Sequence, residues 1–259
     1  MTDAASCGTC RPEAISTEGL TKRYGDACVV DHVDLTVPER AVYGFLGPNG
    51  AGKSTTMKML LGLTHPNEGT ATVLGCPLLP ENRLEVLRSV GSLIESPCCY
   101  PRLTARENLE IVRRLRGLPE SEIDEALSIV GLDGPAARKK AAGNFPLGMR
   151  QRLGIAAPLM GKPPLLLLDE PTNGLDPSGI HEICSLVGSL PERFDVTVVV
   201  SSHLLRDRPD GRPRGHHRRR PHGVARRARR PPCHGTAVDR PEDHRQQARR
   251  TAPPGCPSR

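Results

Sequence analysis

Residues 47–54 constrain the fold of this chain more than any other segment. They read Gly-Pro-Asn-Gly-Ala-Gly-Lys-Ser and fit G-x-x-x-x-G-K-[ST], the pattern of a phosphate-binding loop. The apolar run 41–46 before them predicts a buried strand. After them Met57, Leu60 and Leu61 recur at helical spacing. Because the motif requires a strand, a glycine loop and a helix in this order, we expect an α/β fold that binds a nucleoside triphosphate.

The residue types in the loop are those that bind phosphate groups and their metal ion. Glycines let the backbone turn tightly and present N–H groups, and the helix N-terminus adds a partial positive charge. We expect Lys53 to reach the β- and γ-phosphates and the Ser54 hydroxyl to coordinate Mg²⁺. The predicted nucleotide contacts of the loop are Gly47, Pro48, Asn49, Gly50, Ala51, Gly52, Lys53, Ser54 and Thr55.

Two apolar runs further along the chain end in polar residues. Leucines occupy 165–168, followed by Asp169 and Glu170, which predicts a central parallel strand with carboxylates at its C-terminal end. Ligands of open α/β sheets bind at that edge, so Asp169 is a candidate to hold Mg²⁺ and Glu170 to accept a proton from the attacking water. A second predicted strand, 196–200, leads to His203, a candidate to contact a γ-phosphate or a water.

Two other candidates have alternative readings. Tyr24, on a loop between two predicted strands, can stack on a base or cover the end of a small sheet. Glu95 follows the strand-like run 90–94, where it can approach the metal or be a solvated strand end, and the sequence alone favours the solvated end.

The predicted helices carry end signals. A capping box at 104–107 opens one helix, and a second helix is expected over 123–130. Pro146 is expected at the first position of a helix that runs to about residue 160. Asp176 is expected to cap a helix that starts at Pro177.

Charge is distributed unevenly along the 259 residues. Residues 206–259 hold sixteen Arg and five acidic residues, a net charge of +11, which leaves −4 of the total +7 for residues 1–205. No apolar run approaches the roughly 18–20 residues that span a bilayer, so we expect a cytoplasmic chain. Nine cysteines, an odd number, argue against a complete disulfide framework.

Together these motifs resemble the nucleotide-binding domain of the ATP-binding cassette (ABC) family over about residues 15–205. The loop 47–54 resembles Walker A, and 165–170 resembles Walker B with Glu170 as its catalytic glutamate. Residues 173–176 resemble the D-loop, which makes Asp176 a nucleotide-site candidate. The resemblance gives Tyr24 the role of the adenine-stacking aromatic and His203 that of the switch histidine, beside Lys53 as a catalytic cation.

The resemblance implies a fold and partners. The fold would be a P-loop NTPase core with a mainly parallel sheet, a small N-terminal antiparallel β subdomain and a helical insertion at about 104–160. Two such domains would sandwich two ATP, with Mg²⁺, and drive membrane-spanning subunits in separate chains. Ser54, Glu95 and Asp169 would be the metal ligands.

The sequence departs from the family pattern at two motifs. Glu95 occupies a position that is usually Gln, and this Ile-Glu-x-Pro variant resembles transporters for bacitracin and lantibiotic immunity. In the signature motif, read here as Phe-Pro-Leu-Gly-Met at 145–149, Pro146 replaces the usual Ser. The lost hydroxyl and N–H would have faced the γ-phosphate bound to the other subunit. By the same resemblance Gly148 would be a further nucleotide contact.

Beyond Leu205 the resemblance stops. Residues 206–259 contain nine Pro beside the sixteen Arg, and no Leu, Ile, Met, Phe, Tyr or Lys. We attribute this composition to a frameshift and expect a disordered tail. We also expect residues 1–14 to be disordered. The alternative is an arm that binds nucleic acid or anionic lipid. Because the tail lacks interleaved aromatic residues, we do not expect a nucleic-acid partner.

These inferences favour the ATP-hydrolysing subunit of an ABC transporter that exports an antimicrobial peptide or drug. It would lie on the inner face of the cell membrane as a homodimer. One alternative is a soluble, non-transport ABC ATPase with a nucleic-acid-binding tail. The single phosphate loop favours the transporter, because ribosome-acting relatives usually carry two cassettes in one chain. A third possibility is an inactive, truncated gene product.

Overall fold

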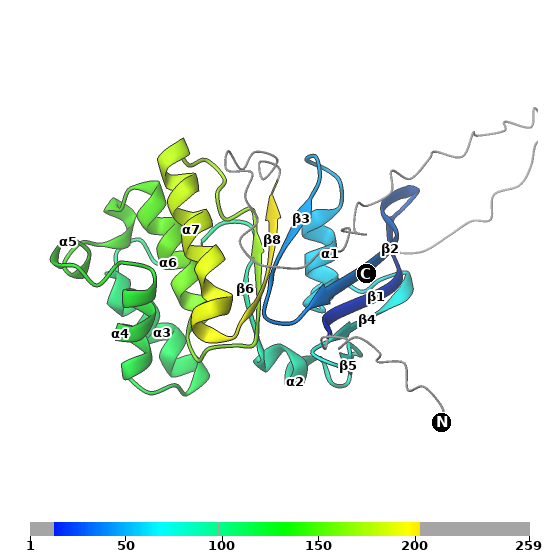
Figure 1. Ribbon diagram of the computed structural model, residues 1–259, viewed down its shortest axis with the longest axis horizontal. Helices are drawn as coiled ribbons and strands as arrows, with labels where there is room; N and C mark the ends of the chain where they lie inside the picture. Colours follow the sequence, from blue (N-terminus) through cyan, green and yellow to red (C-terminus); the bar gives the residue numbers. More distant parts are fainter. Residues whose placement is uncertain (1–12, 98, 203–259) are drawn as a thin grey trace, which may run out of the picture. The chain divides into compact units, whose positions relative to one another are not determined.

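The computed structural model describes residues 13–97 and 99–202 (Figure 1). The predictions for residues 1–12, for His203 and for the tail 206–259 lie outside these ranges. The expected disorder of residues 13 and 14 is wrong, because the first strand already begins at Glu13. Ala14 is fully buried, and its carbonyl accepts a hydrogen bond of 2.8 Å from the Leu74 N–H. This backbone bond holds the start of the strand in place.

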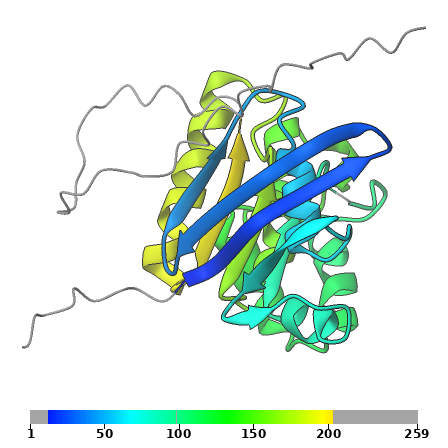
Figure 2. The same ribbon diagram turned by 90° about the vertical axis from the view of Figure 1, so that its right-hand side faces the viewer.

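Four strands form an antiparallel sheet, as the family resemblance predicted. They are β1 (Glu13–Tyr24), β2 (Ala27–Pro38), β4 (Glu68–Val73) and β5 (Cys76–Pro77), in the order β2-β1-β4-β5. β1 and β2 make a hairpin in which Tyr24 pairs with Ala27, and Gly25 supplies the positive φ of 56° that the tight turn requires. The long hairpin crosses the front of the molecule in Figure 2.

Four other strands form a parallel sheet. They are β3 (Val42–Leu46), β6 (Val90–Leu93), β7 (Leu165–Asp169) and β8 (Thr197–Ser202), in the order β3-β8-β7-β6. Every residue of β7 is buried, so the prediction of a central parallel strand over the leucine run is confirmed. Its alternate side chains enter two different cores, Leu165 and Leu167 on one face of the sheet and Leu166 and Leu168 on the other.

The predicted burial of residues 41–46 is wrong. Within the described part of the chain β3 pairs only with β8, and it therefore forms an edge of the sheet. Its residues alternate between exposed and half-buried, and the side chains of Val42 and Leu46 remain 43% and 47% exposed. An apolar run alone does not distinguish an edge strand from a central one.

Helices cover both faces of the parallel sheet. Helix α1 (Lys53–Leu60) packs Met57 and Leu60 against the first face and against the antiparallel sheet. The second face is covered by helices of the predicted insertion together with α7 (Pro177–Phe194), on the left of Figure 1. The elements of this second face besides α7 are α3 (Ala105–Arg116), α4 (Ser121–Ile129), α5 (Pro135–Arg138), the 3₁₀ turn Ala142–Asn144 and α6 (Leu147–Leu159). The short helix α2 (Arg83–Arg88) instead packs Val86 into the core on the first face.

The helix ends mostly follow the sequence signals. Asp176 caps α7, accepting a hydrogen bond of 3.3 Å from the Gly179 N–H, and Pro177 occupies the first position, as predicted. Pro146 is the N-cap of α6 and not its first helical residue, so that prediction is off by one. Proline is compatible with both positions, because neither requires its missing N–H. No helix within residues 13–97 and 99–202 is long and apolar enough to cross a bilayer.

The capping box of α3 provides a test of the fold. The Thr104 hydroxyl accepts a hydrogen bond of 3.3 Å from the Glu107 N–H, and the Glu107 carboxylate accepts one of 2.7 Å from the Thr104 N–H. We expect Thr104→Ala to lower the free energy of unfolding by about 1 kcal/mol, because it removes the cap. Thr104→Ser, which keeps the hydroxyl, should be close to wild type in urea titrations. Equal stability of the Ala and Ser variants would contradict a role for the cap.

Candidate functional site

The C-terminal ends of β3, β7 and β8 meet at one edge of the parallel sheet. Phe45 pairs with Ser201, and Asp169 pairs with the same serine from the other side. The phosphate loop leaves β3 directly after Leu46, and Glu170 follows β7. Parallel pairing therefore brings the loop and the two predicted carboxylates together, at the edge where open α/β sheets bind their ligands.

The backbone of the phosphate loop depends on two glycines. Gly50 and Gly52 have φ angles of 80° and 79°, which side chains rarely allow. Gly52 is also the N-cap of α1, and a Cβ added there would lie 2.5 Å from the Val29 carbonyl oxygen of β2. The loop has room for its turn only because this position lacks a side chain.

The Lys53 ammonium lies inside the loop. It donates hydrogen bonds of 2.7 Å to the Gly47 carbonyl and 3.2 Å to the Pro48 carbonyl, and it lies 3.2 Å from Oε1 of Glu170. The lysine side chain is only 7% exposed and that of Glu170 18%. Two residues to which the sequence assigned different roles in one reaction are thus in direct contact. Glu170 also has a positive φ of 48°, a sparsely populated conformation that recurs at functional sites.

Asp169 is held by a residue whose role sequence reasoning missed. Ser201 Oγ donates a 2.5 Å hydrogen bond to Oδ1 of Asp169, and it accepts one of 2.9 Å from the Glu170 N–H. Asp169 is 2% exposed and Ser201 is fully buried. The signal that could have revealed this contact was the parallel alignment of the two strand ends, which places Ser201 opposite Asp169.

Glu95 contacts a cation on the phosphate-loop helix. Lys58 Nζ lies 2.7 Å from Oε1 of Glu95. The hydrogen bond to Glu95 raises the pKa of Lys58 above its ordinary value, and the same bond lowers the pKa of Glu95. Lys58 also feels the charge of Asp169, which contributes to the raised pKa of the lysine. The sequence motifs gave no indication of a role for Lys58.

The remaining predicted residues lie at the ends of a strand and of two helices, so the prediction that Tyr24 lies on a loop is wrong. Tyr24 is exposed at the end of β1, with the Lys22 ammonium 5.1 Å from its ring centroid. Gly148 lies in the first turn of α6 and Asp176 at the start of α7. The two segments pack together, since a Cβ added at Gly174 would lie 3.2 Å from the Leu147 side chain. His203 lies outside the described residues.

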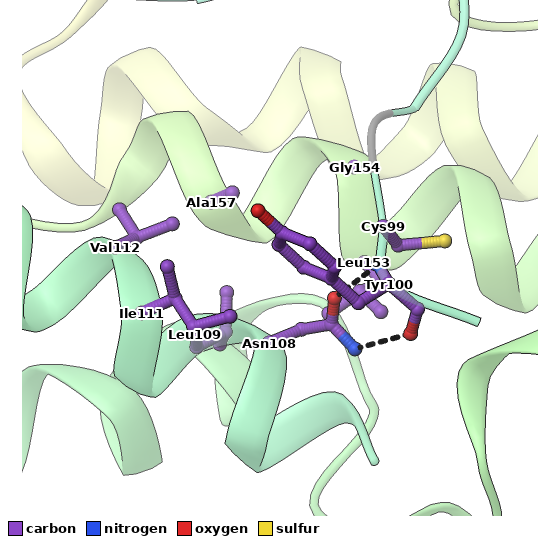
Figure 3. A pocket seen from close by; sticks show the side chains of 9 residues that line it. All are labelled: Cys99, Tyr100, Asn108, Leu109, Ile111, Val112, Leu153, Gly154 and Ala157. Carbon is purple, nitrogen blue, oxygen red and sulfur yellow. Dashed lines mark hydrogen bonds between the residues drawn. The ribbon is translucent and has the colours of Figure 1, made fainter. Parts of the chain in front are cut away.

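A separate small pocket of about 60 Å³, open to solvent, lies between α3, α6 and the segment after Glu95 (Figure 3). Asn108 organises its rim: it accepts a hydrogen bond of 2.7 Å from the Tyr100 N–H and donates one of 3.2 Å to the Tyr100 carbonyl. The lining residues are Cys99, Tyr100, Asn108, Leu109, Ile111, Val112, Leu153, Gly154 and Ala157. None of them belongs to the phosphate loop or the carboxylate pair.

The Ser201 contact leads to a prediction about stability. A hydrogen bond to a charged group contributes about 1.5–3 kcal/mol, and its loss would leave the buried Asp169 carboxylate poorly paired. We expect Ser201→Ala to lower the free energy of unfolding by that amount in urea titrations. Ser189→Ala is a matched control, because its hydroxyl bonds a neutral carbonyl within α7. If both variants lose the same small free energy of unfolding, the hydrogen bond to Asp169 contributes no more to stability than the bond of Ser189 to a neutral carbonyl.

The ABC transporter family pattern matches residues 30–173. The bacitracin transport ATP-binding protein BcrA of Bacillus licheniformis is 50% identical over 192 residues, 74% of this chain and 62% of that protein. This chain thus spans about three fifths of the length of BcrA. The lantibiotic transport ATP-binding protein SrtF of Streptococcus pyogenes is 41% identical over 191 residues, 74% of this chain and 80% of SrtF.

Solved structures agree with the fold. CbiO1 of Clostridium perfringens, described as part of the ABC transporter complex CbiONQ, has a TM-score of 0.66 and 26% identity. The match covers 74% of this chain and 78% of CbiO1. It confirms the predicted fold class, and the sequence relatives confirm the predicted resemblance. The chain belongs to the ABC transporter family.

Proposed function

We propose that this chain is the ATP-binding and ATP-hydrolysing subunit of a transporter that exports an antimicrobial peptide or drug. The observation that carries the proposal is the position of Lys53, inside the phosphate loop and 3.2 Å from Glu170. A buried cation and a carboxylate base at one sheet edge suit phosphoryl chemistry. The names of BcrA and SrtF support a peptide antibiotic as the transported class.

In this proposal the triphosphate occupies the loop 47–55. Lys53 would exchange its contacts with the loop carbonyls for the β- and γ-phosphates, and the backbone N–H groups before α1 would bind the remaining oxygens. Tyr24 would stack on the base with the ring face that Lys22 does not cover.

The residues present fit Mg²⁺. The Ser54 hydroxyl lies in the first turn of α1, and Asp169 keeps one carboxylate oxygen that no hydrogen bond to Ser201 occupies. Oxygen ligands of this kind are those that Mg²⁺ prefers, and Glu95 would be the third. Residues 13–97 and 99–202 contain no group of three His, Cys, Asp or Glu side chains that would hold a metal alone. The ion would therefore bind together with the nucleotide phosphates, whose negative charge it would neutralise.

Hydrolysis would use residues at the same edge. Glu170 would orient the attacking water and accept its proton, and Lys53 would stabilise the charge that develops on the γ-phosphate. Ser201 would keep Asp169 in place through its 2.5 Å hydrogen bond. We assign a γ-phosphate contact to His203 by family resemblance.

Two partners complete the proposal. A second copy of the chain would face the N-terminal ends of α6 and α7, where Gly148 and Asp176 lie side by side on packed segments. A separate membrane-spanning subunit would hold the pair at the inner, cytoplasmic face of the cell membrane and select the substrate. The description of CbiO1 as part of a transporter complex supports such an assembly.

Lys53→Ala tests nucleotide binding. The substitution removes a charge-assisted contact to phosphate worth about 1.5–3 kcal/mol, so MgATP affinity should fall roughly ten- to a hundredfold in a calorimetric titration. Lys162→Ala, which removes an exposed lysine of the loop after α6, is the control and should bind like wild type. Equal binding by wild type and Lys53→Ala would refute the proposed site.

Pro146 tests the role of the signature motif. As the N-cap of α6 it offers neither a side-chain cap nor an N–H. Removing one preorganised donor typically costs about 10²–10³ in kcat, so Pro146→Ser should raise kcat while the MgATP affinity stays nearly constant. Pro146→Ala restores only the N–H and separates this effect from that of the hydroxyl. Steady-state phosphate release measures all three proteins. If neither substitution raises kcat, residue 146 does not influence the rate of hydrolysis.

A further inference from the structure

The contact between Lys58 and Glu95 links the nucleotide site to the segment after β6. Lys58 lies four residues after Ser54, on the neighbouring turn of the same face of α1. Its ammonium is 2.7 Å from the Glu95 carboxylate, with side chains 35% and 68% exposed. The pair therefore joins the helix that carries the phosphate loop to a segment 37 residues away.

Two observations distinguish this pair from an ordinary surface ion pair. Glu95 has a φ of 67°, in the left-handed region that non-glycine residues rarely occupy, so its backbone is constrained. The segment is also held at its far end. Pro97 packs closely on α6, because a Cβ added at Gly154 would lie 2.7 Å from the Pro97 Cβ. Asn108 then fixes Tyr100 by two hydrogen bonds (Figure 3).

The local charges explain why the lysine is needed. Asp169 and Glu170 already place two carboxylates at the C-terminal edge of the parallel sheet, and the Lys53 ammonium contacts Glu170. Glu95 adds a third negative charge just after β6, the parallel neighbour of β7. A triphosphate is itself highly negative, so any part of the Glu95 charge that neither Mg²⁺ nor Lys58 offsets would weaken nucleotide binding by repulsion. Lys58 is the cation that contacts Glu95 among the described residues.

We propose that Lys58 is a positioning residue for Glu95 and supplies the positive charge that permits a carboxylate there. The inference rests on the proposed nucleotide site. It makes a specific statement about coupling: Lys58 matters because residue 95 is Glu, and it should lose its importance when residue 95 is Gln.

A double-mutant cycle tests this coupling. MgATP dissociation constants would be measured by calorimetry at low salt for wild type, Lys58→Gln, Glu95→Gln and the double variant. We expect Lys58→Gln to weaken binding about two- to fivefold, the range of a partly exposed ion pair. The same substitution in the Glu95→Gln background should change binding by much less. Lys58→Arg, which keeps the charge, should retain most of the affinity, and higher salt should reduce the loss.

Controls separate this role from general effects on the fold. Lys162→Gln breaks another exposed pair, in which the Lys162 ammonium lies 2.8 Å from Glu125, and it should leave MgATP binding unchanged. Equal weakening by Lys58→Gln with Glu or Gln at position 95 would overturn the inference, because Lys58 would then act on the nucleotide directly. No weakening at all would overturn it as well. Failure of wild type to bind MgATP would instead refute the proposed function.

Discussion

The parallel pairing of β7 with β8 determines where the charged groups of the site lie. It places Asp169 beside Ser201, and the pairing of β3 with β8 places the phosphate loop one strand further along. Successive side chains of a strand point to opposite faces, so a slip of one residue would exchange the leucines of β7 between the two cores. The apolar packing of β7 thus holds the register, and the register holds the carboxylates.

Two charged groups are nearly buried at this edge, Lys53 and Asp169. Burial of a charge is costly unless the group is paired and hydrogen-bonded. Lys53 is compensated by loop carbonyls and by Glu170, and Asp169 by the Ser201 hydroxyl. These partners come from β7, β8 and the phosphate loop, so the charges are compensated only in the folded chain. Because a buried ion pair is weak evidence for stability, we infer that the arrangement serves to preorganise the site.

Local patterns predicted much of the fold and less of the site. The leucine run before Asp169 and the N-cap Asp176 were recognised because each signal lies within a few residues. The contacts of Ser201 with Asp169 and of Lys58 with Glu95 join residues 32 and 37 positions apart, and spacing carries no information about such pairs. The pairing partners of a strand are also distant in the sequence, so the apolar run of β3 gave no sign that this strand lies at an edge. The role of His203 stays a prediction.

An edge strand is an unexpected support for a phosphate loop, because among the described residues only β8 pairs with it. Its start is fixed by the Arg40 N–H, which donates a 2.8 Å hydrogen bond to the Thr197 hydroxyl. Beyond its end, Gly52 approaches the Val29 carbonyl so closely that no Cβ would fit. The hairpin of β1 and β2 therefore constrains the phosphate loop. In a central strand, a second parallel strand paired with β3 would provide this constraint. The antiparallel sheet thus has a structural role at the phosphate loop.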